Sequence, residues 1–168
     1  MICKNEKLKI ATEDCLKMCD ELQIPYKKIR KVTINYRAKK RWGFCKQVDG
    51  QFNIEISNRL LNEDADEKAL KTTILHEILH TVPGCMNHGR AWKYYAGILN
   101  QKFGYNIKRT TSAKEKGVED ISVTLTPKHK FVCQKCNAEV VRYKESKFTQ
   151  NHTKYSCAVC GGRFKMVF

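Results

Sequence analysis

The spacing of hydrophobic residues changes several times along the chain, and each change predicts a new element. Residues 6–22 have apolar side chains three and four positions apart, which is the period of an amphipathic helix. These side chains are Leu8, Ala11, Cys15, Cys19 and Leu22. Pro25 ends the pattern, because a proline disfavours helical backbone in the residue before it.

A strand pattern follows, in which apolar and polar residues alternate. The alternation from Val32 to Tyr36 predicts one strand. Residues 41–57, RWGFCKQVDGQFNIEIS, predict a hairpin, because Asp49 and Gly50 supply a tight two-residue turn. We therefore expect a short, mainly antiparallel sheet.

Two further helical patterns follow the expected sheet. Residues 58–82 return to helical spacing with a wide apolar surface, and a Pro-Gly pair comes directly after them. A last helix is expected over residues 90–103, with Gly104 in the stop position. Helices packed on a short sheet predict an α+β fold.

The remaining sequence suggests a division into three parts. Residues 105–125 are mostly polar and weakly periodic, which is typical of a linker or an irregular extension. Residues 126–168 form a short, cysteine-rich tail. We expect one domain over residues 1–104, the linker or extension over 105–125, and a small separate module over 126–168.

The segment HEILH holds the first candidate site. On a helix, His76 and His80 lie one turn apart on one face, so both imidazoles could bind one zinc ion. Glu77 lies on nearly the same face, where its carboxylate could take a proton from water activated by the metal. His88 is the best candidate for a third ligand, because the Pro-Gly pair can turn the chain back after the helix.

Other interpretations of this segment remain open. The histidines could be core residues that serve packing alone, and Cys85, in the same loop as His88, is more typical of a packed thiol than of a ligand. The spacing is not that of metzincins, because Pro83 and Met86 occupy the positions of their glycine and third histidine. A gluzincin-like acidic ligand is missing, because residues 90–103 contain no Asp or Glu.

The tail holds the second candidate site. Two CxxC pairs, Cys133 with Cys136 and Cys157 with Cys160, are separated by twenty residues. Each pair can present two thiolates to one ion, so together they predict a closed, four-cysteine structural zinc site in a zinc ribbon. A redox pair is the alternative. The odd total of nine cysteines and the absence of a secretory signal favour metal ligation over disulfides.

The charge of the chain suggests a polyanionic partner. The formal net charge is +15, residues 27–46 hold nine basic residues and no acidic one, and thirteen basic residues face five acidic ones beyond Gly104. Such a surface favours non-specific, salt-dependent DNA contact. Tyr143, Phe148 and Tyr155 could stack on unpaired bases, which favours single strands. The alternative is a solvated basic surface without a ligand.

Several segments together resemble one known family. The matching segments are RWGFC, FNIEIS with NRLL after it, TTILHEILH, HGRAW and the zinc ribbon. They resemble the SprT-like zinc metallopeptidases, whose eukaryotic relatives, the Spartan proteases, cut proteins crosslinked to DNA. The resemblance implies a zincin-like fold in which His76, His80 and His88 bind a catalytic zinc and Glu77 is the general base. It also implies that a protein substrate lies as an added strand along the sheet edge beside the active-site helix.

Two hypotheses follow for the function. The first is a zinc-dependent endopeptidase acting on DNA-associated or DNA-crosslinked proteins, with one catalytic and one structural zinc. The second is a nucleic-acid-binding adaptor in which both metals are structural. The sequence has no stretch long and apolar enough for a membrane span, and residues 1–15 do not resemble a signal peptide. We therefore expect a monomeric cytoplasmic protein without membrane contact.

Overall fold

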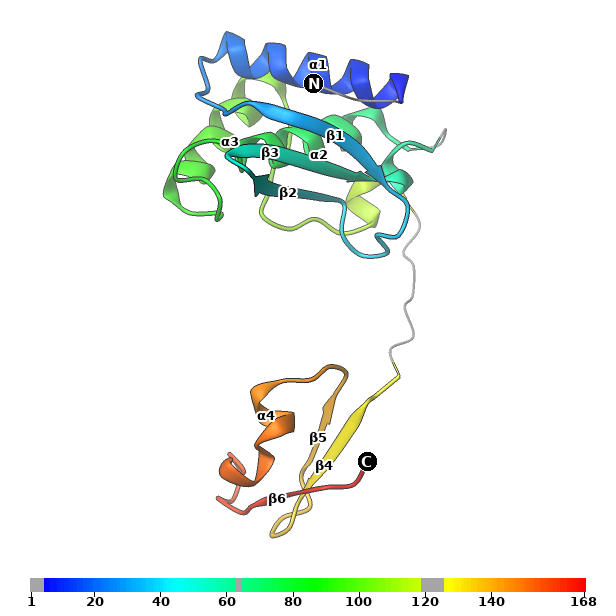
Figure 1. Cartoon of the computed structure of the whole chain (residues 1–168), viewed down its shortest axis with the longest axis vertical. Helices are drawn as coiled ribbons and strands as arrows, with labels where there is room; N and C mark the ends of the chain where they lie inside the picture. Colours follow the sequence, from blue (N-terminus) through cyan, green and yellow to red (C-terminus); the bar gives the residue numbers. More distant parts are fainter. Residues whose placement is uncertain (1–4, 63–64, 119–125) are drawn as a thin grey trace. The chain divides into compact units, whose positions relative to one another are not determined.

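The computed structural model describes residues 5–62, 65–118 and 126–168. The chain forms two compact units, Met1–Ile121 and Ser122–Phe168, and each is described by itself (Figure 1). Within the described residues, none of the helices has the length and apolar character needed to cross a membrane.

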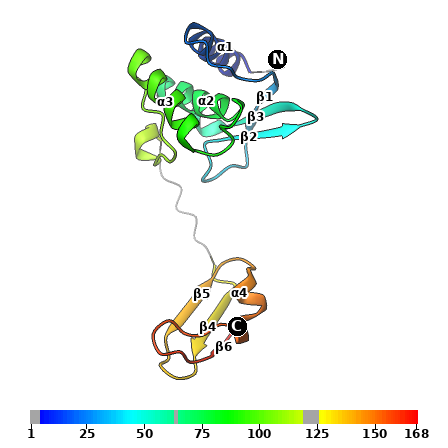
Figure 2. The same ribbon diagram turned by 90° about the vertical axis from the view of Figure 1, so that its left-hand side faces the viewer.

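The first unit combines helices with a three-stranded sheet. Figure 2 shows its three helices on one side of that sheet. In chain order its elements are α1 (Glu6–Glu21), β1 (Ile29–Asn35), β2 (Gly43–Val48), β3 (Gln51–Ser57), η1 (Asn58–Leu60), α2 (Glu67–Leu79), α3 (Arg90–Phe103) and η2 (Lys114–Lys116).

The hairpin expected from the sequence is confirmed. Strands β2 and β3 pair antiparallel, with Val48 opposite Gln51 on either side of the turn. Asp49 and Gly50 both have positive φ angles, 49° and 73°. A two-residue turn of this kind requires left-handed backbone at both positions, which Asp tolerates and Gly adopts freely.

The first strand joins the hairpin in a way that the hydrophobic pattern did not indicate. Strand β1 pairs with β3 in parallel, and the strand order is β1-β3-β2. Residues 36–42 therefore carry the chain from the end of β1 past β3 to the far edge of the sheet. As a result, one of the two pairings in this sheet is parallel, and β2 lies at its edge with β3 in the centre.

Helix α2 lies at the centre of the hydrophobic core. Leu70, Ile74 and Ile78 are fully buried, as are Ile54 and Ile56 on β3. The helix contacts α1, α3, β2 and β3. Asp66 begins it by accepting a hydrogen bond from the backbone N–H of Lys68, which satisfies one of the free donors of the first turn. Because α2 is held on several sides, its side chains have well-defined positions.

Residues 105–118, which we call the return segment, fold back along the first unit after α3. Gly104 ends α3 in the left-handed conformation, with φ at 68°. The side chain of Asn100 then holds the backbone of Ile107 through two hydrogen bonds, of 2.7 and 3.2 Å. Ile107, Ala113 and Lys116 are buried. The return segment is the described part of the region expected as a linker or irregular extension, and residues 119–125 lie outside the description.

The second unit is a small antiparallel sheet with two short helical segments. Its elements are β4 (His129–Cys133), β5 (Glu139–Arg142), α4 (Lys147–Gln150), η3 (His152–Lys154) and β6 (Phe164–Met166), and its strand order is β5-β4-β6. Its buried core consists of Phe131, Cys133, Cys157 and Phe164, with Phe148 among the side chains packed against it. The α+β fold class with a C-terminal module that fits a zinc ribbon is therefore confirmed.

Candidate metal centres and active site

Three histidines from two segments converge at one end of α2. His76 lies in the last turn of the helix, His80 is its C-cap, and His88 lies just before α3. The Nε2 atom of His76 is 3.3 Å from that of His80 and 3.0 Å from that of His88. The structure thus brings together the three histidines expected to bind one metal ion, with one ring nitrogen from each within 4.8 Å of the others.

Two backbone carbonyls orient the histidine rings. Nδ1 of His76 lies 3.0 Å from the carbonyl oxygen of Lys108, and Nδ1 of His80 lies 2.9 Å from that of Cys85. A carbonyl oxygen can only accept a hydrogen bond, so Nδ1 carries the proton in both rings. Each Nε2 atom then keeps a lone pair directed at its neighbours. This is the tautomer that a metal ligand needs, fixed by the hydrogen bond on the opposite nitrogen.

The surroundings also keep these imidazoles neutral. Burial, followed by the neighbouring His80 and His88, lowers the pKa of His76 to about 3. Burial likewise lowers the pKa of His80 and of His88. Three neutral lone pairs at such short separations repel one another unless a cation lies between them. The donor set therefore suits a metal ion better than it suits packing alone.

The geometry of the three nitrogens agrees with zinc. A tetrahedral zinc ion with bonds of roughly 2.0–2.1 Å to nitrogen places neighbouring ligand atoms about 3.3 Å apart. The Nε2 atom of His76 lies 3.3 and 3.0 Å from those of His80 and His88. Three protein ligands leave a fourth position for water or substrate, which is the arrangement of catalytic zinc sites.

An indole ring packs against all three histidines. Trp92, on the first turns of α3, is buried, and its ring centroid lies 4.9 Å from that of His76 and 4.7 Å from that of His88. It also stacks on His80 at 6.0 Å. The side chain of Cys85 is buried and is not part of the histidine group; only its carbonyl contacts the site. Trp92 thus limits how far any of the rings can rotate.

Glu77 is buried beside the histidines, with only 5% of its surface exposed. Its side chain packs against the backbone of Gly43 at the start of the edge strand β2. Burial raises the pKa of Glu77 to about 8, and the positive charges of Arg41 and Lys116 oppose that rise. A carboxyl group with a raised pKa holds and releases a proton near neutral pH, as a general acid–base catalyst must.

A cavity opens beside His76 and Glu77, and we call it the basic cleft. Its volume is about 300 Å³. The start of β2 with the residues before it, helix α2 and the return segment form its walls. The lining residues are Lys40, Arg41, Trp42, Gly43, Thr72, Thr73, His76, Glu77, Lys108, Arg109, Thr110, Thr111 and Lys116. Burial lowers the pKa of Lys116 to about 8, partly offset by Glu115, Asp66 and Glu77.

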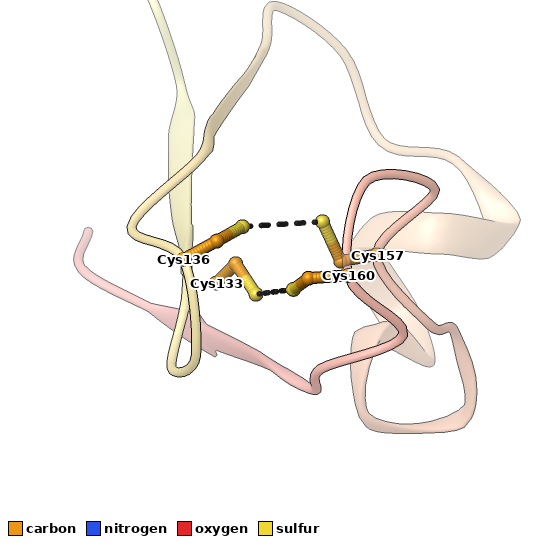
Figure 3. Close-up of side chains that lie close together, drawn as sticks. All are labelled: Cys133, Cys136, Cys157 and Cys160. Carbon is orange, nitrogen blue, oxygen red and sulfur yellow. Dashed lines mark hydrogen bonds between the residues drawn. The ribbon is translucent and has the colours of Figure 1, made fainter.

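The second candidate centre lies in the C-terminal unit, where two pairs of cysteines face each other (Figure 3). Sγ of Cys133 is 3.4 Å from that of Cys160, and Sγ of Cys136 is 3.7 Å from that of Cys157. Disulfide sulfurs would be roughly 2.05 Å apart. Zinc–sulfur bonds of roughly 2.3 Å place the corners of a tetrahedron about 3.8 Å apart. The spacing therefore fits a four-thiolate metal site and not disulfides.

In one of the two CxxC pairs, backbone hydrogen bonds favour the thiolate form of the first cysteine, Cys133, while at Cys136 the backbone N–H of Ala138 lowers the pKa but the neighbouring thiols raise it to about 12. The backbone N–H of Cys136, followed by that of Lys135, lowers the pKa of Cys133 to about 6. Metals bind thiolates, so such hydrogen bonds favour the binding form. Gly162 packs close by, because an added Cβ would lie 2.8 Å from Sγ of Cys133. All four donors are protein ligands, which suits a structural ion.

Three residues of the histidine site were given no role by the sequence analysis. Gly43 and Lys108 lie far from the HEILH segment along the chain, whereas Trp92 follows His88 by four residues; in all three, the contact with the site depends on the fold. Lys108 contacts the histidines only through its carbonyl, a group that every residue type has. A sequence signal existed only for Trp92 and Gly43, as the tryptophan of HGRAW and the glycine of RWGFC.

A helix that carries paired histidines around a buried glutamate, packed on a small sheet, defines a metallopeptidase-like architecture. The chain belongs to the SprT-like family, whose model matches residues 12–112. Comparison with curated proteins found no match. The matched region contains both the histidine centre and the edge strand β2, while the cysteine centre lies beyond it. Family membership supports a metallopeptidase-like role.

Proposed function

We propose that this protein is a zinc-dependent endopeptidase of the SprT-like type. The observation that carries the proposal is the convergence of three histidine Nε2 atoms next to the buried carboxyl group of Glu77. A purely structural site would have no use for a buried acid beside an open coordination position. Burying an ionisable group is costly, which favours a functional reason for its presence.

In this proposal the chain's own residues hold the metal and move the proton. His76, His80 and His88 hold the zinc ion, which when bound acts as a Lewis acid and lowers the pKa of water. Glu77 accepts a proton from the attacking water and then donates it to the amine that leaves. The burial of Glu77 keeps competing solvent away from this transfer.

The sheet edge offers a place for the substrate. Strand β2 is at the edge of the sheet and starts at Gly43, directly beside Glu77. An extended peptide could add to its free side through backbone hydrogen bonds, which are independent of side-chain identity. Such a peptide would run past the metal centre, so a carbonyl group could approach the zinc ion.

The proposal is tested by Glu77→Gln, which keeps the size of the side chain and removes its basicity. We expect kcat for cleavage of an unfolded protein such as casein to fall by about 10²- to 10⁴-fold. Zinc content, measured by native mass spectrometry, should stay at that of the wild type. Glu67→Gln, the same substitution in the exposed first turn of α2, serves as the control.

Undiminished cleavage by Glu77→Gln would contradict the proposed mechanism. Zinc-loaded wild type that cuts no protein would favour the adaptor hypothesis.

We also propose that the C-terminal unit contacts DNA, with a preference for single strands. Tyr143 and Tyr155 are exposed, and exposed basic residues flank them, among them Lys144 and Lys154. Exposed aromatic and basic side chains together suit stacked bases and a phosphate backbone. Phe148, the third aromatic residue expected to stack on bases, is partly buried and packs against the core of the unit, with its ring 4.9 Å from that of Phe131.

The DNA proposal is tested by the salt dependence of oligonucleotide binding, followed by fluorescence anisotropy. We expect log K to fall linearly with log salt, by about 0.7 per phosphate contact on a single strand. Tyr155→Ala should weaken binding at every salt concentration, and Lys144→Gln should reduce the slope. Lys17→Gln, an exposed change on α1, is the control. Affinity that does not depend on salt would contradict the electrostatic basis of the proposal.

A further inference from the structure

The basic cleft has a marked excess of positive charge. Five of its lining residues are Lys or Arg, and Glu77 is its one acidic residue. Arg41 has a partner in Glu55 at 3.6 Å, and Lys108 pairs with Glu115 at 2.6 Å. Within the described parts of the chain, Lys40, Arg109 and Lys116 have no carboxylate within ion-pair distance. Among the described residues, the cleft therefore holds three cations that form no direct ion pair, although Glu115, Asp66 and Glu77 act on Lys116 from a greater distance.

Lys116 is the unusual member of this group, because only 5% of its surface is exposed. Its Nζ atom donates to Oγ1 of Thr73 at 2.8 Å and to the carbonyl oxygen of Ala69 at 3.3 Å. Both partners are neutral, and an ammonium group has three protons to donate. A buried cation without an anionic partner is unfavourable. An anion entering the cleft would supply that partner.

The position of the cleft indicates which part of a bound peptide would carry the anionic group. His76 and Glu77 form part of its wall, so the cleft begins at the metal centre. Gly43, the first residue of the edge strand, lines it as well. A peptide bound along β2 with its scissile bond at the metal would place a neighbouring side chain at this opening. The volume of about 300 Å³ is at the lower end of the range of ligand pockets.

We propose that the basic cleft is a specificity pocket that binds the carboxylate of an Asp or Glu side chain next to the scissile bond. This inference rests on the proposed peptidase function and names the kind of residue that the enzyme prefers. The carboxylate would accept hydrogen bonds from Lys116 at the base of the pocket and from Arg109 at its rim. A carboxylate on a flexible stem can reach a cation that is almost fully covered. A phosphodiester, which has a sugar on each side, cannot reach so deep.

Matched peptides test the proposal. Two fluorogenic peptides would differ only in Glu or Gln at the position next to the cleaved bond, after that bond has been located by mass spectrometry. We expect wild type to favour the Glu peptide by at least about tenfold in kcat/KM, because a hydrogen bond to a charged carboxylate is stronger than one to a neutral amide. Lys116→Met and Arg109→Gln should each lower this ratio towards one. Lys17→Gln on α1, an exposed lysine away from the cleft, should keep the wild-type ratio.

A binding measurement separates the failure of this inference from the failure of the proposed function. Both peptides would be titrated into zinc-loaded Glu77→Gln protein, with and without Lys116→Met or Arg109→Gln. If wild type cleaves neither peptide but Glu77→Gln still binds the Glu peptide more tightly through Arg109 and Lys116, the pocket stands and the peptidase proposal fails. Equal affinity and equal cleavage of both peptides would overturn the pocket.

Loss of oligonucleotide affinity in Lys116→Met, with the peptide ratio unchanged, would assign the cleft to nucleic acid instead. Because Arg109 is exposed, its variant remains informative if Lys116→Met fails to fold.

Discussion

The carboxyl group of Glu77 lies where a side chain at position 43 would have to be. A Cβ atom added to Gly43 would be 2.6 Å from Cγ and 2.8 Å from Cδ of Glu77. Carbon atoms in proteins do not approach so closely without displacement. The absence of a side chain at Gly43 therefore allows the edge strand and the buried acid to share one wall of the active site.

Gly43→Ala should consequently displace Glu77 without removing it. A shift of about 1 Å in a reacting group can cost about 100-fold in rate, so we expect kcat to fall by about that factor. Zinc content should not change, because the three histidines are untouched. Gly97→Ala on α3 provides the control, because a Cβ atom added at Gly97 would have no neighbouring atom within 4 Å. Wild-type activity in Gly43→Ala would show that the position of Glu77 is not critical.

Trp92→Leu should weaken metal binding at the histidine centre. The indole ring packs against His76, His80 and His88, and leucine would leave all three rings freer to rotate. Groups that orient metal ligands typically change affinity by about 10- to 100-fold, and we expect the lower end. Competition with a chromogenic chelator would measure this. Trp92→Phe retains an aromatic ring and should lose less, so equal losses in both variants would argue against ring packing as the cause.

Asn100→Ala should loosen the return segment. The amide group of Asn100 makes both hydrogen bonds to the backbone of Ile107, and that backbone is partly buried. Leaving these groups unpaired should lower the free energy of unfolding by about 1–3 kcal/mol, as measured by urea denaturation. Zinc affinity should fall as well, because Lys108, the next residue, holds the ring of His76. Gln101→Ala, an exposed amide on the same helix, should change neither quantity.

Loss of metal from the C-terminal unit should unfold that unit. Two of its four buried core residues, Cys133 and Cys157, are also candidate ligands. The core of the unit and its metal site therefore depend on each other. Structural zinc contributes roughly 10–16 kcal/mol in small zinc-binding domains. In the full chain, Cys136→Ser should make residues 126–168 sensitive to trypsin while α1 to α3 stay protected. Ser156→Ala, at an exposed neighbour, should keep the wild-type digestion pattern.

The features that could be predicted from the sequence are those that depend on local chemistry. Asp49 and Gly50 determine the turn of the hairpin by their backbone preferences, and the turn sets the pairing of Val48 with Gln51. Likewise, Gly104 ends α3 as expected, in the left-handed conformation. The histidine and cysteine groups were foreseeable because close spacing on one helix, or in one CxxC turn, leaves few arrangements open.

The features that could not be predicted depend on contacts between distant residues. The parallel pairing of β1 with β3 is decided by the packing of the whole sheet, and the sequence of neither strand shows which strand it will pair with. The basic cleft is another example, because Lys40, Lys116 and Glu77 come from separate segments. In the sequence, Lys116 is one lysine among many in a polar stretch, and only the fold buries it.

The hydrogen bond between His76 and the carbonyl of Lys108 has a consequence for how the protein folds during its synthesis. The two residues are 32 positions apart, and the later one lies beyond α3. On a ribosome, the chain is made from its N-terminus, so both helices around the metal exist before the group that aligns His76 has been synthesised. A nascent chain that stops at α3 would hold all three candidate metal ligands and still lack the carbonyl group that orients His76. Any activity that depends on the orientation of His76 would therefore arise only after Lys108 has been synthesised and the return segment has folded back.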